Sequence, residues 1–130
     1  MDAFGHVNNV VYFRYFESAR IEYLDRVGWM ASKDLTGHGP IVHSTSARFR
    51  KALTYPDLIR VGGRVTDMQA DRVTIEHLVW SDRLSAPAAV GQVIVVNFDY
   101  RMGSKEKMPE GVRAAILELE RACGNAPQLG

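Results

Sequence analysis

The stretch MDAFGHVNNVVYFRYFESAR, residues 1–20, decides the fold of this 130-residue chain. A cluster of polar residues and one glycine directly precedes a segment with helical periodicity. These residues are Asp2, Gly5, His6, Asn8 and Asn9. Asparagine favours the N-cap position because its side chain accepts a hydrogen bond from a free backbone N–H, so Asn8 or Asn9 should begin the helix. Polar groups crowded at a helix N-terminus can hold a developing oxyanion beside a carboxylate.

The helix is expected to extend to about residue 27, where Gly28 follows as a left-handed C-terminal residue. Apolar and aromatic side chains recur at spacings of three and four residues. The main stripe consists of Tyr12, Phe16, Ala19, Tyr23 and Val27, and it is widened by Val10, Phe13 and Leu24. An apolar arc of this width predicts a helix that other structure wraps around, instead of one resting on a surface.

After the helix, residues 29–40 are expected to form a connection, and the hydrophobic period then changes to two. Four strands are expected at residues 41–50, 58–69, 72–81 and 88–101. Strands in succession with short turns indicate an antiparallel sheet, which must curl around the apolar helix. A short helix opened by Pro109 follows, and the tail over residues 124–130 is expected to be disordered. The prediction is a single α+β domain over residues 1–123.

Two details of the strands are also predicted. Gly62 and Gly63 indicate a bulge or a close backbone approach. His43 and His77 lie on apolar strand faces, where most histidines are core residues with satisfied hydrogen bonds.

Composition excludes several functional classes. Hydrophobic residues make up 46% of the chain and the formal net charge is +1, so no nucleic-acid or membrane surface is indicated. The longest apolar runs are too short to span a bilayer. A single cysteine, Cys123, cannot form an internal disulfide and fits a cytoplasmic location; it is assigned no role. The four histidines lack metal-ligand spacing with Cys or acidic residues, so no metal is predicted.

The run D-A-F-G-H-V-N-N-x-x-Y-x-x-Y-F-E-x-A-R at residues 2–20 resembles the signature of the hotdog-fold acyl-CoA thioesterases. It is most similar to the 4-hydroxybenzoyl-CoA thioesterase and YbgC/FadM-like branch, and R-F-R-K-A-L-x-Y-P-D at residues 48–57 extends the similarity. The resemblance implies a hotdog fold, in which a curved antiparallel sheet wraps around one long central helix. Family members carry a strand before the aspartate that is missing here, so we expect the native chain to extend upstream of Met1.

The resemblance also implies roles for the residues before the helix. Asp2 would act on the thioester carbonyl as nucleophile or general base, and the Asn9 backbone N–H would polarise the carbonyl oxygen. Gly5 would permit the tight turn, while His6 and Asn8 would orient Asp2, the water or the acyl group. Without the resemblance, these residues are equally well explained as a turn and a cap.

Residues that would bind the substrate follow from the same resemblance. Arg48, Arg50 and Lys51 would contact the phosphates of coenzyme A, and Arg60 and Arg64 are weaker candidates. Tyr12, with Phe13 and Phe16, would line an acyl tunnel or simply belong to the core. Coenzyme A is part of the substrate, so no separate cofactor is expected. The protein would be a homodimer or homotetramer with active sites between subunits.

Two alternatives remain open at this stage. A hotdog hydratase acting on enoyl- or hydroxyacyl-thioesters would need an acid/base histidine paired with a carboxylate, which His6 and Asp2 could imitate. A non-catalytic acyl-CoA-binding module would keep the pocket, while any hydrolysis would not depend on Asp2. Release of free thiol, and its dependence on Asp2, separates the three possibilities.

Overall fold

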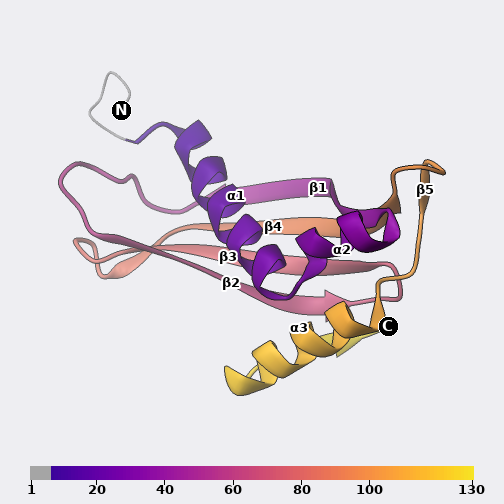
Figure 1. Cartoon of the computed structure of the whole chain (residues 1–130). Coiled ribbons are helices and arrows are strands. Elements are labelled where there is room, and N and C mark those ends of the chain that lie inside the picture. Colours follow the sequence, from indigo (N-terminus) through magenta and orange to yellow (C-terminus); the bar gives the residue numbers. More distant parts are fainter. Residues whose placement is uncertain (1–6) are drawn as a thin grey trace.

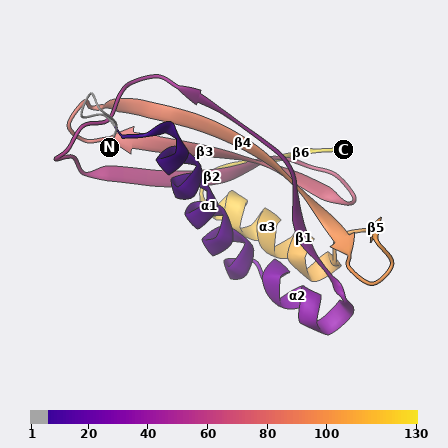
Figure 2. The ribbon, with the colours of Figure 1, turned by 90° about the horizontal axis from the view of Figure 1, so that it is seen from above.

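The computed structural model describes residues 7–130, and the predicted Asp2, Gly5 and His6 lie outside that range. The elements occur in the order α1 (Asn9–Arg26), α2 (Trp29–Thr36), β1 (His38–Phe49), β2 (Ile59–Met68), β3 (Arg72–Ser81), β4 (Ala86–Asp99), β5 (Ser104–Lys105), α3 (Glu110–Ala122) and β6 (Gln128–Leu129). The helices lie against one face of a curved, open sheet (Figures 1 and 2).

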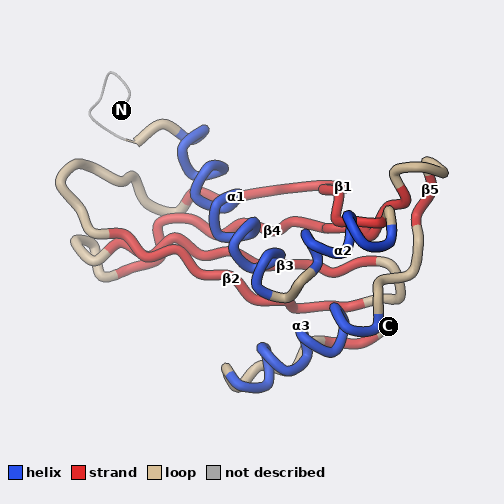
Figure 3. The backbone as a smooth tube through the Cα atoms, in the orientation of Figure 1, coloured by secondary structure: helices blue, strands red, loops and turns tan. Residues whose placement is uncertain are grey.

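The sheet has the strand order β1-β4-β3-β2-β6, and β5 pairs with the end of β4. Neighbouring strands are antiparallel, apart from the parallel contact between β2 and β6. The long strands β3 and β4 lie inside the sheet, whereas β1 forms one edge of it (Figure 3). The predicted α+β architecture with successive antiparallel strands is confirmed.

Helix α1 begins where the sequence predicts. Asn8 is its N-cap, and the Asn8 side chain accepts a hydrogen bond of 2.9 Å from the Val10 N–H. Gly28 follows the helix with a φ of 79°, a left-handed conformation that glycine adopts without a steric penalty. The burial pattern shows that the sheet of one chain covers only one side of α1. Tyr12 and Phe16 are buried, whereas other apolar positions such as Val10 are exposed.

Two hydrophobic clusters fix α1 on the sheet. One lies under its N-terminal half and includes Tyr12, Phe16, Leu53 and Val79, while the other joins its C-terminal half to α2 and α3. Gly91 on β4 makes the close contact possible, since a Cβ atom there would lie 2.8 Å from the Phe16 ring. Any larger residue at that position would force the helix away from the sheet.

His77 on β3 lies between these clusters and is 1% exposed. Its ring stacks on Phe16, with 5.7 Å between the ring centroids. Nδ1 lies 3.4 Å from the Gly62 carbonyl oxygen, which can only accept, so Nδ1 carries the proton of the neutral ring. Nε2 has no hydrogen-bond partner among the described residues, contrary to the expected satisfied core histidine. Gly63 permits this packing, because a Cβ atom there would lie 2.9 Å from Nδ1.

Burial lowers the pKa of His77 from its ordinary value of 6.5 to about 4. The unfolded chain therefore binds a proton at His77 at a higher pH than the folded chain does. The stabilising contribution of neutral His77 is complete above about pH 6.5, and it is lost as the pH falls through about 4.

We predict that His77→Asn, which keeps a donor near Nδ1 but cannot titrate, flattens the pH dependence of unfolding between these values. The variant should avoid a loss of free energy of unfolding on the order of 3 kcal/mol, which the wild type suffers when His77 becomes protonated. Urea unfolding at several pH values measures it, with the exposed His43→Asn as a matched control. An equally steep curve for His77→Asn and the wild type would contradict the assignment.

Residues 29–40 are not only a connection, because the first part of this segment forms α2. Gly28 and Gly37, both left-handed, bracket the helix. Its first residue, Trp29, is fully buried and donates a 2.9 Å hydrogen bond from Nε1 to Oδ1 of Asn97 on β4. The predicted connection is therefore divided between α2, which is capped by Gly37, and the first residues of β1.

Strand β1 also differs from the expectation of one buried face. Most of its side chains are exposed, including Ile41, Val42 and Phe49. The register against β4 shifts between Val42 and Ser44, so His43 lies at an irregularity and is exposed instead of belonging to the core. Within the described residues, β1 pairs with a strand on one side only, where β4 lies.

The sequence predicts a disordered tail over residues 124–130, but the structure shows part of this tail in a strand. Gln128 and Leu129 form β6 beside Asp67 and Met68 of β2, and the Gly130 N–H donates to the Met68 carbonyl at 3.0 Å. The short strand β5 lies between β4 and α3, and Pro109 is the N-cap of α3 instead of its first residue.

Candidate functional site

The N-terminus of α1 lies beside the segment that leaves β1. The Val7 N–H donates a 2.9 Å hydrogen bond to the Leu53 carbonyl and thereby anchors the chain as it enters the helix. Between the helix and this segment is a cavity of about 220 Å³. Its lining consists of Val7, Asn9, Tyr12, Phe49, Arg50, Lys51 and Ala52. The fold therefore brings together residues from two sequence regions that were each predicted to contribute to a site.

Tyr12 joins the helix to the basic segment. Its hydroxyl donates a 3.3 Å hydrogen bond to the Lys51 carbonyl, and its ring meets Phe49 edge to face with centroids 5.1 Å apart. The side chain is 1% exposed, and burial raises the pKa of the hydroxyl. Tyr12 therefore remains a neutral donor that holds the backbone of Lys51, which makes it a positioning residue.

The backbone of the basic segment is fixed to the sheet. The N–H groups of Arg50 and Lys51 both donate to the Ala88 carbonyl, at 2.8 and 3.1 Å. Their side chains remain exposed at the cavity. Two cationic side chains and the positive end of a helix dipole consequently face the same space, which suits a phosphate or a developing oxyanion.

The other predicted residues are placed as follows. Asn8 caps the helix and accepts from Val10, while Asn9 begins the helix and lines the cavity. Arg48 is exposed on β1 and does not line the cavity.

Two further arginines that were weaker candidates for phosphate contacts form surface ion pairs. Arg60 pairs with Asp82 at 3.3 Å, and Arg64 pairs with Glu76 at 3.0 Å. Such pairing makes these two arginines poor candidates for phosphate contacts.

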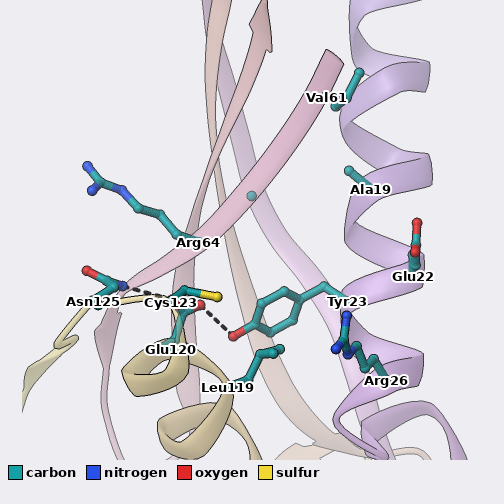
Figure 4. A pocket seen from close by; sticks show the side chains of 12 residues that line it. Ala19, Glu22, Tyr23, Arg26, Val61, Arg64, Leu119, Glu120, Cys123 and Asn125 are labelled. Atoms are coloured by element: carbon teal, nitrogen blue, oxygen red, sulfur yellow. Dashed lines mark hydrogen bonds between the residues drawn. The ribbon is translucent and has the colours of Figure 1, made fainter.

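A larger cavity, of about 460 Å³, lies at the opposite end of α1, between α1, β2 and α3 (Figure 4). Of the residues predicted for catalysis, Asn8 and Asn9 are within the described chain, and neither lines this cavity, although Arg64 does. Within it, the Tyr23 hydroxyl points at the Glu120 carboxylate. Cys123, which had been given no role, also lines this cavity.

Glu120 joins three elements beneath this cavity. Its Oε1 accepts from the Tyr23 hydroxyl at 2.7 Å and from the Val65 N–H at 2.8 Å, while Oε2 accepts from Asn125 Nδ2 at 2.9 Å. Asn125 also donates to the Val65 carbonyl at 2.9 Å. The carboxylate is 3% exposed and engaged with three donors, so its role is to fasten α3 to α1 and β2. The periodicity of α3 did not reveal it, since a glutamate there is normally solvated.

We predict that Glu120→Ala lowers the free energy of unfolding by about 2–4 kcal/mol, because it leaves buried donors on Tyr23 and Val65 without an acceptor. Glu118→Ala, an exposed position of the same helix, should change it by less than about 0.5 kcal/mol. Chemical denaturation of both variants measures the difference. Equal stabilities would show that the network contributes nothing.

The absence of a metal site was predicted from spacing along the chain alone. The spacing of residues along the chain does not show which side chains the fold brings close together. Among residues 7–130, His38, Asp99 and Glu106 place one potential ligand atom each within 4.8 Å of one another.

Residues 1–116 match the family described as the thioesterase-like superfamily, and the chain belongs to that family. It is 24% identical over 122 residues to an acyl-acyl carrier protein thioesterase, ATL3, from Arabidopsis thaliana. The match covers 93% of this chain but only 64% of that protein's length.

Solved structures agree with this assignment. A thioesterase from Thermus thermophilus, crystallised with coenzyme A and Zn, superposes with a TM-score of 0.79 at 28% identity. The match covers 93% of this chain and 86% of that one. A DHNA-CoA thioesterase from Staphylococcus aureus has the same TM-score at 16% identity, covers 100% of this chain and 91% of its own, and shares the fold. The architecture is that of the hotdog thioesterases, as predicted.

No helix within residues 7–130 is both long and apolar enough to cross a membrane.

Proposed function

We propose that this chain is an acyl-CoA thioesterase, which hydrolyses a thioester to a free carboxylic acid and coenzyme A. The observation that carries the proposal is the shared cavity of Asn9 at the helix start and the basic pair Arg50 and Lys51, in a chain of the thioesterase-like superfamily. The cavity offers cationic side chains for the phosphates and a helix N-terminus for the thioester carbonyl.

The proposed chemistry divides between these groups. The Asn9 N–H, assigned to the thioester oxygen from the resemblance, is not engaged by the Asn8 cap, which accepts from the Val10 and Val11 N–H groups. Asp2, assigned from the resemblance, either removes a proton from the attacking water or attacks the carbonyl carbon itself. In both cases the carbon–sulfur bond breaks and coenzyme A leaves as a thiolate that takes up a proton. His6 and Asn8 would orient these groups, and Gly5 would allow the turn.

The proposal includes assembly as a homodimer or homotetramer with sites between subunits. Its support is β1, which lies at the sheet edge and carries exposed apolar side chains, among them Ile41, Val42 and Phe49. Phe49 also lines the cavity, so a partner strand beside β1 would reach the site. The single cysteine, Cys123, is free and exposed, which accords with a reducing cytoplasmic location.

We predict that Asp2→Asn lowers kcat by about two to four orders of magnitude while KM changes little, because the carboxylate acts on the reacting carbonyl. Free thiol release from short, long and aromatic acyl-CoAs measures the rate, with acyl-acyl carrier protein as a further substrate. Asp25→Asn, an exposed aspartate near the other end of α1, is the control and should keep wild-type activity.

The outcomes separate the competing functions. Water addition to an enoyl-CoA without thiol release would favour a hydratase. Saturable acyl-CoA binding with no turnover by the wild type would indicate a binding module. Hydrolysis at the wild-type rate by Asp2→Asn would leave the activity standing and refute the mechanism.

We predict that Arg50→Ala and Lys51→Ala each raise KM for acyl-CoA about tenfold, with a smaller change in kcat, because each removes a charge-assisted contact to phosphate. The effect should shrink at high salt. Arg48→Ala, outside the cavity, should have less effect, and Arg121→Ala on α3 should have none. A simple acyl thioester without the nucleotide should be hydrolysed equally by wild type and both variants. Sensitivity of that substrate to the substitutions would contradict a phosphate-binding role.

A further inference from the structure

The geometry points to a binding site for a divalent transition-metal ion, with Zn²⁺ as the best match, formed by His38, Asp99 and Glu106. The site lies where β1 begins, where β4 ends and just after β5. It is separate from the proposed catalytic cavity, which is lined by residues at the start of α1 and the end of β1.

Strand pairing creates the first half of the site. His38 is the residue opposite Asp99 in the register of β1 against β4. The His38 Nε2 lies 3.9 Å from the Asp99 Oδ2, and both side chains are partly shielded, with exposed fractions of 26% and 14%. Zinc at about 2.0–2.1 Å from its ligands holds neighbouring ligand atoms about 3.3 Å apart. The His38 Nε2 and the Asp99 Oδ2 are therefore within about 1 Å of the separation that two ligands of one zinc ion have.

The Asp99 carboxylate is already oriented for this task. Its Oδ1 accepts from the N–H groups of Arg101 and Met102, at 2.8 and 3.0 Å, which fixes the group at the turn after β4. Oδ2 is the oxygen that faces His38. Hydrogen bonds of this kind to a ligand's other atom are what hold metal ligands in place.

Glu106 supplies the third donor, and its backbone is also tied to β4. The Glu106 N–H donates a 3.0 Å hydrogen bond to the Asn97 carbonyl, and Asn97 Nδ2 donates to the Lys107 carbonyl at 2.9 Å. The ligand atoms of Glu106, His38 and Asp99 all lie within 4.8 Å of one another. Binding of the ion would draw these atoms in to the separation of about 3.3 Å that zinc ligands have.

Two cationic side chains near the site contact other groups. The Arg101 guanidinium donates to the Thr36 carbonyl at 3.0 Å, and the Lys33 ammonium lies 4.2 Å from the centre of the Tyr100 ring. The carboxylates of Asp99 and Glu106 would supply negative charge, and the His38 imidazole a nitrogen donor, to an incoming ion. One nitrogen with two oxygens suits zinc or a similar transition metal better than Ca²⁺ or Mg²⁺, which prefer oxygen alone.

Such an ion would fasten the edge strand β1 to β4 and to the segment after β5. Calorimetric titration of the chelator-treated full chain with Zn²⁺ should give one site per chain. The same preparation with Co²⁺ should develop the visible absorption of a cobalt ion held by nitrogen and oxygen ligands. At zinc about 100-fold above the dissociation constant, Tm should rise by roughly 5–10 °C.

Three variants test the ligands while sparing the fold. Asp99→Asn keeps an oxygen for the Arg101 and Met102 amides, and His38→Gln and Glu106→Gln keep side-chain size. Each should weaken Zn²⁺ binding by at least about tenfold and remove the cobalt absorption. His43→Gln, an exposed histidine on the same strand, is the matched control and should bind as the wild type does.

The proposal is overturned if the wild type binds no Zn²⁺, or if all three variants bind it as tightly as His43→Gln. Loss of binding in His43→Gln, with the three variants unaffected, would place the ion elsewhere and overturn it as well. Thiol release in the same preparations is a separate readout, so a failed metal site leaves the thioesterase proposal untouched.

Discussion

The close approach of α1 to the sheet is the constraint on which the rest of the structure depends. It exists because Gly91 leaves room for the Phe16 ring and Gly63 leaves room for the His77 imidazole. A helix that lies this near the strands buries Tyr12 at one end and Leu24 at the other. Both hydrophobic clusters are arranged along that line of contact, which fixes where the two ends of α1 lie.

The two ends of α1 then serve different purposes. At the N-terminus, Tyr12 draws the backbone of Lys51 toward the helix, so charged side chains and a helix dipole share one small space. At the C-terminal end, Tyr23 and Glu120 close a polar junction with α3. The larger cavity belongs to this junction, whose carboxylate already has its donors. The proposed chemistry is therefore assigned to the smaller cavity, which Asn9, Arg50 and Lys51 line.

Local sequence patterns predicted the features that depend on local structure. The Asn8 cap, the Gly28 terminus and the succession of strands follow from residue preferences and periodicity. Features that depend on distant partners could not be predicted. The helix α2 is held by the contact of Trp29 with Asn97, 68 residues away, and Glu120 is buried only because β2 supplies the Val65 amide. The proximity of His38 to Asp99 likewise comes from strand register, which spacing along the chain does not encode.

The two edges of the sheet are unequal. On β2, the far end is occupied, since β6 pairs with Asp67 and Met68 and side chains from α3 and the segment after it satisfy both backbone groups of Val65. On β1, the outer edge is open along its length within the described chain. A subunit with one long unpaired edge and one partly covered edge can pair its β1 with the β1 of a second copy about a twofold axis. Neither copy then has a free β1 edge. Such an assembly would close on itself, and the same asymmetry would protect it against growth into filaments.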